Sequence, residues 1–106
     1  MRITIKMTKD DARSLSRFLA VYSQEIPDAR FVKRVLEDDY LRLERVVRGV
    51  RGERISFSLD ALTVAMLQID LVNRVLKSRF DESNQYMIIW AIEEVNRNLE
   101  QMQMRE

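Results

Sequence analysis

Two short segments of this chain share one pattern, and their spacing constrains the fold more than any other feature. Residues 2–8 (RITIKMT) and 54–60 (RISFSLD) each alternate polar and apolar side chains, as a half-buried β-strand does. Each segment ends in a residue that favours the start of a helix, and two long amphipathic stretches follow it. We therefore predict the order β-α-α-β-α-α, with possible βαα units at residues 1–52 and 53–106.

The helix ends are predicted from capping residues and breakers. Thr8 and Asp60 follow the two strand patterns and are suited to cap the next helix. Proline disfavours helical geometry in the residue before it, and glycine commonly ends a helix. The four predicted helices run from Thr8 to Ile26, from Pro27 or Asp28 to about Val50, from Ala61 to about Arg79, and from about Glu82 to Met102.

These elements predict a single α+β domain over residues 1–106, predominantly helical, with four helices and a two-stranded antiparallel sheet. At an offset of 52 residues the two halves share Arg, Ile and two Leu residues, which suggests a pseudo-duplication. The sheet is expected to turn one apolar face toward the core. The predicted core comprises Ile3, Ile5, Ile55, Phe57, Leu15, Leu19, Leu36, Leu43, Leu62, Met66, Ile69, Ile88, Ile92 and Val95.

Composition narrows the possible functions. The 106 residues contain neither cysteine nor histidine, which removes thiolate chemistry and the commonest general base and metal ligand. No segment has the pattern of a signal peptide or a membrane-spanning helix, so a cytoplasmic protein with no membrane partner is predicted. The formal net charge of +1 divides into +4 for residues 1–52 and −3 for residues 53–106.

The first candidate site is the outward face of the predicted strands. The segment Arg2–Met7, with its polar cap and following helices, resembles the ribbon-helix-helix family of DNA-binding proteins. In that family two strands pair into an antiparallel ribbon that lies in the DNA major groove, and outward side chains read base edges. The resemblance implies a nucleic-acid-binding set of Arg2, Thr4, Lys6, Arg54, Ser56 and Ser58.

A second candidate is a series of arginines near the end of the second predicted helix. Arg42, Arg45, Arg48 and Arg51 recur every three residues, so successive side chains spiral around the helix. Such a series could form an anion patch for phosphate or an acidic partner. Alternatively, the arginines only offset the negative end of the helix dipole.

The remaining polar clusters do not indicate catalysis. Neighbouring carboxylates at Glu37–Asp39 and Glu93–Glu94 point in different directions on a helix, so we expect solvated faces rather than a metal site. The sequence lacks a glycine-rich phosphate loop, a nucleophile elbow and a metal-binding motif. We therefore predict a protein that is not an enzyme and that needs no cofactor or metal.

A last feature is the excess of apolar residues for so small a domain. Residues 86–92 are seven consecutive apolar residues, more than one helix face can bury. Tyr86, Met87, Ile89 and Trp90 are the predicted interface residues. The primary prediction from sequence is thus a small protein-interaction or regulatory domain that self-associates, for instance as a homodimer. DNA binding through a ribbon is the alternative.

Overall fold

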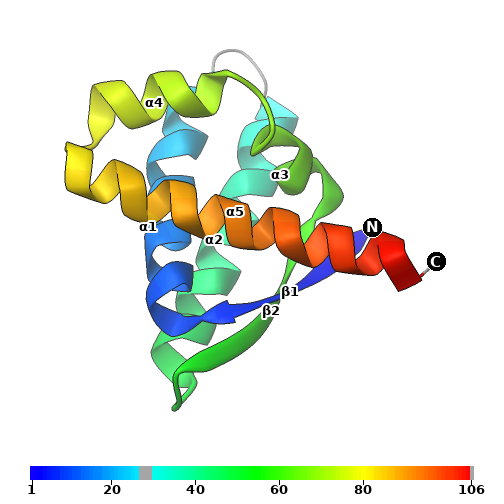
Figure 1. The fold of residues 1–106 in the computed structure, drawn as a ribbon. Coiled ribbons are helices and arrows are strands. Elements are labelled where there is room, and N and C mark those ends of the chain that lie inside the picture. The colour runs from blue at the N-terminus through cyan, green and yellow to red at the C-terminus, as the bar shows by residue number, and fades with distance from the viewer. Residues whose placement is uncertain (27–29, 106) are drawn as a thin grey trace.

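A computed structural model of the protein describes residues 1–26 and 30–105. It confirms the predicted class, a predominantly helical α+β fold with one two-stranded antiparallel sheet, but it contains five helices (Figure 1). The expected start of the second helix at Pro27 or Asp28 lies outside the described residues. The elements are β1 (Arg2–Thr8), α1 (Lys9–Glu25), α2 (Arg30–Gly49), β2 (Arg54–Asp60), α3 (Ala61–Met66), α4 (Leu71–Arg79) and α5 (Glu82–Arg105).

The two strands pair in a register that is symmetric at the 52-residue offset. Ile5 lies opposite Phe57, which is its own counterpart in the second unit. Ile3 lies opposite Leu59, and their two counterparts, Ile55 and Met7, also form a pair. The helices that follow the strands keep the same spacing, since α1 and α3 also begin 52 residues apart. An approximate two-fold axis therefore passes through the centre of the ribbon.

The long last helices of the two units, α2 and α5, flank the ribbon in a reciprocal way. Helix α2 packs beside β2, and α5 packs beside β1, so each unit's last helix contacts the other unit's strand. Helix α1 packs against both α2 and α5 (Figure 1). The edges of the ribbon are therefore covered by helices, which limits pairing with further strands.

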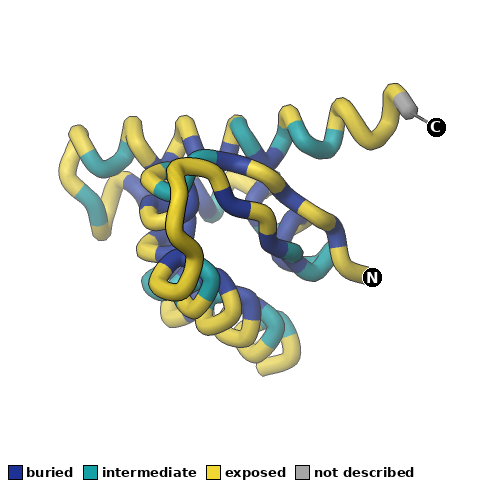
Figure 2. The backbone as a smooth tube through the Cα atoms, turned by 90° about the horizontal axis from the view of Figure 1, so that it is seen from below, coloured by how far each residue is buried: buried dark blue, intermediate teal, exposed yellow. Residues whose placement is uncertain are grey.

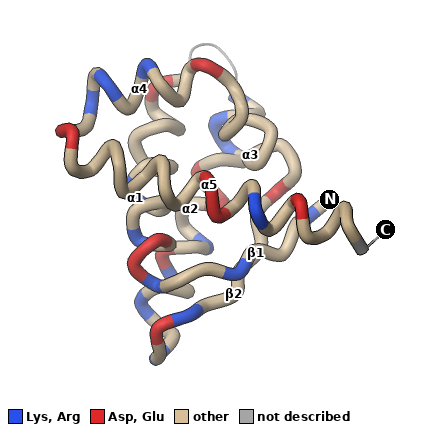
Figure 3. Tube along the Cα trace, in the orientation of Figure 1, with Lys and Arg blue, Asp and Glu red and all other residues tan. Residues whose placement is uncertain are grey.

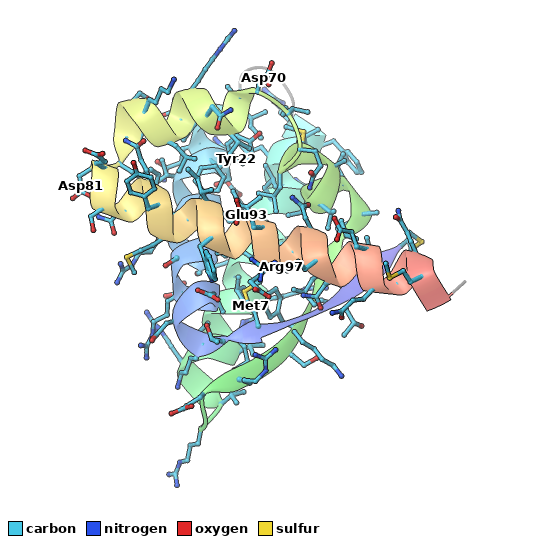
Figure 4. The ribbon with its side chains drawn as sticks, viewed as in Figure 1. Met7, Tyr22, Asp70, Asp81, Glu93 and Arg97 are labelled. Carbon is cyan, nitrogen blue, oxygen red and sulfur yellow. The ribbon has the colours of Figure 1, made fainter. Side chains whose placement is uncertain are left out.

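The core lies between the inner face of the ribbon and the helices. Along both strands buried and exposed residues alternate, as Figure 2 shows, and the buried set faces α1. Met7 and Tyr22 are fully buried; Figure 4 shows Tyr22 between α4 and α5, and Met7 between α5 and the strands. The predicted core residues found buried are Ile3, Ile5, Ile55, Phe57, Leu15, Leu19, Leu36, Leu43, Ile88, Ile92 and Val95.

The predicted continuous helix from Ala61 to Arg79 is wrong. It is divided into α3 and α4 by a turn over residues 67–70. In an uninterrupted helix the carbonyl of Met66 would accept a bond from the amide of residue 70. Here the Tyr22 hydroxyl donates to that carbonyl at 2.7 Å instead, so a side chain from α1 takes the place of the helical bond.

Three predicted core residues near this turn are more exposed than expected. Leu62 and Met66 are only half-buried, and Ile69 in the turn is 44% exposed. The prediction assumed one straight helix, in which all three would lie on the inner face. The break rotates the chain after Met66, so Ile69 faces solvent.

Among the described residues, no helix combines the length and the apolar content required to cross a lipid bilayer.

Candidate functional site

The ribbon brings the six residues of the predicted nucleic-acid-binding set onto one face. All six occupy even-numbered positions, whose side chains point away from the core. Ser58 is half-buried and the other five are exposed. Across the ribbon Thr4 lies opposite Ser58, and Lys6 lies opposite Ser56. We call this outward surface, formed by Arg2, Thr4, Lys6, Arg54, Ser56 and Ser58, the ribbon face.

Arg2 is fixed in place rather than free to reach a ligand. Its side chain crosses β2, where Nε donates to the Ser58 hydroxyl at 2.9 Å and Nη2 donates to the Ser58 carbonyl at 2.8 Å. Nη2 also pairs with the carboxylate of Asp39 at 2.9 Å. Arg2 therefore orients the ribbon face and is the least mobile cation on it.

Asp39 is the main correction to the predicted solvated acidic cluster. Its side chain is only 1% exposed, on the face of α2 toward β2. One carboxylate oxygen accepts from Arg2, and the other accepts from the Asp60 amide at 2.8 Å and the Thr63 hydroxyl at 2.6 Å. Three donors thus satisfy both oxygens of this buried carboxylate, which makes Asp39 a structural anchor rather than a ligand for metal.

The spacing of apolar residues in α2 also predicts that Asp39 is buried, although the expectation from sequence was a solvated carboxylate. Asp39 follows Leu36 by three residues and precedes Leu43 by four, so it lies on the buried stripe of α2. A carboxylate at such a position needs several donors to be stable there. The Asp60 amide at the end of β2, the Thr63 hydroxyl of α3 and the Arg2 side chain supply them.

Asn98 of α5 holds the other edge of the ribbon. The ladder bonds at its two ends join Lys9 to Glu53 and Ala61 to Met1, which are odd-numbered pairs. Even-numbered residues of β1 therefore direct backbone groups outward. The Asn98 side chain accepts from the Lys6 amide and donates to the Lys6 carbonyl, both at 2.9 Å. This leaves the Lys6 ammonium on the ribbon face with no ion pair among the described residues.

The predicted anion patch does not form one cluster. Arg42 and Arg45 lie beside Phe57 and Ser58 and so extend the ribbon face along α2. Arg48 turns toward α1 and pairs with Glu44, and Arg51 is exposed in the loop between α2 and β2. The three-residue spacing rotates each arginine away from the previous one, which separates them.

Acidic residues gather where β1 enters α1 (Figure 3). Asp10 and Asp11 begin α1, and Glu53 lies next to them in the loop before β2. Together with Lys9 and Trp90 they line a shallow hollow at this end of the ribbon. The positive part of the ribbon face is therefore bounded on one side by negative charge.

The predicted interface residues lie on the first half of α5. Tyr86 is 65% exposed and Trp90 is 53% exposed, with Met87 and Ile89 also exposed. The Arg97 guanidinium lies 5.1 Å from the centre of the Trp90 ring and also pairs with Glu94. Figure 4 shows Glu93 and Arg97 on α5, one turn apart. We call Tyr86, Met87, Ile89 and Trp90 the α5 patch.

Two tyrosines have perturbed acidity. Burial raises the pKa of Tyr22 to about 12, and its hydroxyl is already bonded to Met66. The pKa of Tyr40 is raised mainly by a hydrogen bond to Glu44. Both hydroxyls therefore stay protonated at neutral pH and can only donate or accept hydrogen bonds. Within residues 1–26 and 30–105, no cluster of three or more acidic side chains could hold a metal ion.

Comparisons with protein-family models, with curated proteins and with solved structures found no match to this chain. The fold and the ribbon face are therefore the basis for assigning a class of function.

Proposed function

We propose that this protein binds double-stranded DNA by laying its ribbon face in the major groove. The observation that supports the proposal best is the intramolecular pairing of β1 and β2. It collects two cations that form no ion pair among the described residues, and four further polar side chains, on one exposed two-stranded surface. A two-stranded β-ribbon fits the major groove, which is about 12 Å wide. The resemblance to ribbon-helix-helix proteins is in keeping with this arrangement, here within a single chain.

The residues of the ribbon face divide into two roles under this proposal. Thr4 and Ser56, near the middle of the ribbon, suit hydrogen bonds to base edges. The side chains of Lys6 and Arg54 form no ion pair among the described residues, so their charged groups can reach bases or phosphates. Arg42 and Arg45 on α2 lie beside the ribbon and suit contacts with the flanking phosphate backbone.

The low net charge sets the expected strength of binding. Five cations surround the ribbon face, but the acidic end at Asp10, Asp11 and Glu53 opposes them. If three or four phosphates are neutralised, the logarithm of the affinity falls with the logarithm of salt concentration with a slope of about −3. The protein therefore needs base contacts for useful affinity at physiological salt. DNA binding also requires a compartment that contains DNA, for instance a cytoplasm.

The test is fluorescence anisotropy of a labelled random duplex titrated with protein at about 50 and 200 mM salt. Lys6→Ala and Arg54→Ala are the informative variants, because neither side chain forms an ion pair among the described residues. We expect salt-sensitive binding by the unchanged protein and at least a fivefold loss in the double variant. Lys77→Ala on α4 is the matched control, since Lys77 is equally exposed but distant from the ribbon.

Two results would refute the proposal. One is no binding at 50 mM salt, and the other is equal binding by the double variant and by the unchanged protein. Circular dichroism of each variant shows whether the fold is intact. Arg2 is unsuitable for this test because its removal also exposes Asp39, which would confuse loss of binding with loss of stability.

Self-association is a second proposed function, supported by a different surface. The four residues of the α5 patch are all exposed, and such a concentration of large apolar side chains marks an interface. A two-fold dimer would bury this patch against its own copy. Sedimentation velocity of the protein and of the Tyr86→Ser, Met87→Ser double variant tests this. A monomer at 100 μM before any substitution would exclude it.

A further inference from the structure

A groove between α1 and α2 lies on a surface that neither the ribbon face nor the α5 patch includes. It encloses about 580 Å³, which is within the size range of small-molecule sites. Val21 of α1, Val47 of α2 and Phe80 form its apolar lining. Phe80 reaches the groove from the end of α4 and contacts the core through Phe18, with ring centres 6.0 Å apart.

The rim of this groove is positively charged. Arg13 and Arg17 project from α1, and Arg48 projects from the facing helix α2. Arg13 has only a long contact of 3.4 Å to Asp10, and both side chains are largely exposed. Arg48 pairs with Glu44, which is the one acidic residue that lines the groove in the described part of the chain. Arg17 has no ion pair among the described residues, so the groove has an excess of positive charge.

The arginines supply the donors for an acidic group. Tyr40 also lines the groove, but its hydroxyl is hydrogen-bonded to the Glu44 carboxylate, which raises the pKa of Tyr40. Guanidinium groups can hold a carboxylate or sulfonate. An inorganic ion would leave the apolar lining unused, whereas a ligand with a hydrophobic body would cover it.

We propose that the groove between α1 and α2 binds a small organic anion, with its acidic group on the arginine rim and its apolar body against Val21, Val47 and Phe80. This site is separate from the DNA-binding surface and does not depend on it. Charge complementarity identifies the ligand class, because an apolar lining with cations on both walls fits an amphipathic anion best.

The probe for the test is 8-anilinonaphthalene-1-sulfonate, an aromatic anion whose fluorescence rises in apolar sites. We expect saturable binding at one site, with affinity in the micromolar range. Arg17→Gln should weaken binding at least fivefold, because it removes the rim cation that has no partner. Glu44→Gln should strengthen binding about threefold, because it removes a carboxylate from the groove and releases Arg48.

Three controls test whether the dye binds in the groove through its sulfonate. Lys77→Gln removes an exposed cation of α4 outside the groove and should leave affinity unchanged. N-phenyl-1-naphthylamine has a similar apolar body without the sulfonate, so its binding should not respond to Arg17→Gln. Trp90→Ala removes the largest member of the α5 patch and should not change the dye affinity.

Opposite shifts for Arg17→Gln and Glu44→Gln would support the site. Equal affinity in the unchanged protein and in Arg17→Gln would overturn it. Loss of dye binding in Trp90→Ala would overturn it as well, because the dye would then lie on α5. Both Arg17 and Glu44 are surface residues of long helices, so the variants are expected to fold.

Discussion

Each edge of the ribbon is held by one polar side chain from a flanking helix, but the two side chains differ in charge and in burial. At the β2 edge, Asp39 of α2 accepts from the Asp60 amide, and at the β1 edge, Asn98 of α5 bonds both backbone groups of Lys6. Asp39 is charged and almost fully buried, whereas Asn98 is neutral and half-buried. Each junction joins the last helix of one unit to the strand of the other.

The difference shows how a pseudo-symmetric fold can fix one edge more firmly than the other. A buried carboxylate requires several donors and loses stability sharply if one is missing. An amide near solvent can exchange its partners for water at small cost. The β2 edge should therefore be the rigid reference of the ribbon, and the β1 edge should open first.

The largest effect is expected from Asp39→Ala. It leaves the Asp60 amide and the Thr63 hydroxyl without their partner and releases Arg2. We expect the free energy of unfolding to fall by about 3–5 kcal/mol, because two donors in the protein interior are left unsatisfied. Urea denaturation followed by circular dichroism measures it. A loss below about 1 kcal/mol would contradict the assignment of Asp39 as the anchor.

Asp39→Asn separates the role of charge from the role of shape. The amide keeps one acceptor oxygen but places an NH₂ group toward either Arg2 or the Thr63–Asp60 side. The expected destabilisation is smaller than for alanine and still above about 1 kcal/mol. An effect equal to that of alanine would mean that the negative charge carries the whole junction.

The next effect concerns Tyr22, which joins the units through Met66. A tyrosine whose folded pKa is about 12 stabilises the fold fully below its unfolded pKa of about 10. That stability is lost as pH rises through the folded value, because the unfolded chain releases the proton first. Between pH 9 and pH 12 we expect a loss of up to about 2–3 kcal/mol.

Tyr22→Phe is the matched variant for this pH dependence. It should cost about 1 kcal/mol at pH 7 through the lost bond to Met66. Its stability should then decline less steeply above pH 10 than that of the unchanged protein. Urea midpoints of both proteins at four pH values give the comparison, in which the other tyrosines and the lysines cancel. If the stabilities of both proteins declined in parallel with pH, the pKa of Tyr22 would not be raised in the folded state.

The sequence predicted the ribbon well because its signals are local. Alternation over seven residues sets which side chains point outward, and Thr8 and Asp60 cap α1 and α3 through bonds to Asp11 and Leu62. These bonds lie within three residues of each cap. The ribbon face could thus be assigned before the strands were known to pair.

The break between α3 and α4 could not be predicted in this way. At this break the Met66 carbonyl accepts from Tyr22, which lies 44 residues away, so no local pattern contains both residues. The separation of Arg48 from Arg42 and Arg45 likewise depends on how α2 is rotated against β2 and α1. Burial of Asp39 was visible as a position on the apolar stripe, but its donors come from two distant segments.

A smaller effect is expected from Asn98→Ala, the counterpart of the Asp39 substitution. The two bonds to Lys6 are lost, but the freed backbone groups lie at an accessible edge and can bind water. The free energy of unfolding should fall by about 1–2 kcal/mol. Asn73→Ala on the exposed face of α4 is the control and should change stability by less than about 0.5 kcal/mol.

Hydrogen exchange sharpens the same contrast residue by residue. The Lys6 amide should exchange faster in Asn98→Ala than in the unchanged protein, and the Asp60 amide should not. If Asn98→Ala cost as much as Asp39→Ala, the two edges would be equivalent despite their different burial.

The smallest effect is expected from Arg97→Gln, which tests a charged but exposed residue on the same helix as Asn98. Arg97 contacts Glu93, Glu94 and the Trp90 ring, yet its side chain is 47% exposed. Exposed pairs of this kind contribute about 0.2–1 kcal/mol because water screens them and ordering the side chains costs entropy. We expect a change below about 1 kcal/mol, which shrinks further in 1 M salt. A charged residue with three partners near solvent should therefore matter less than neutral, half-buried Asn98, and far less than buried Asp39. A loss comparable to that of Asp39→Ala would mean that the number of partners, rather than burial, sets the strength of each junction.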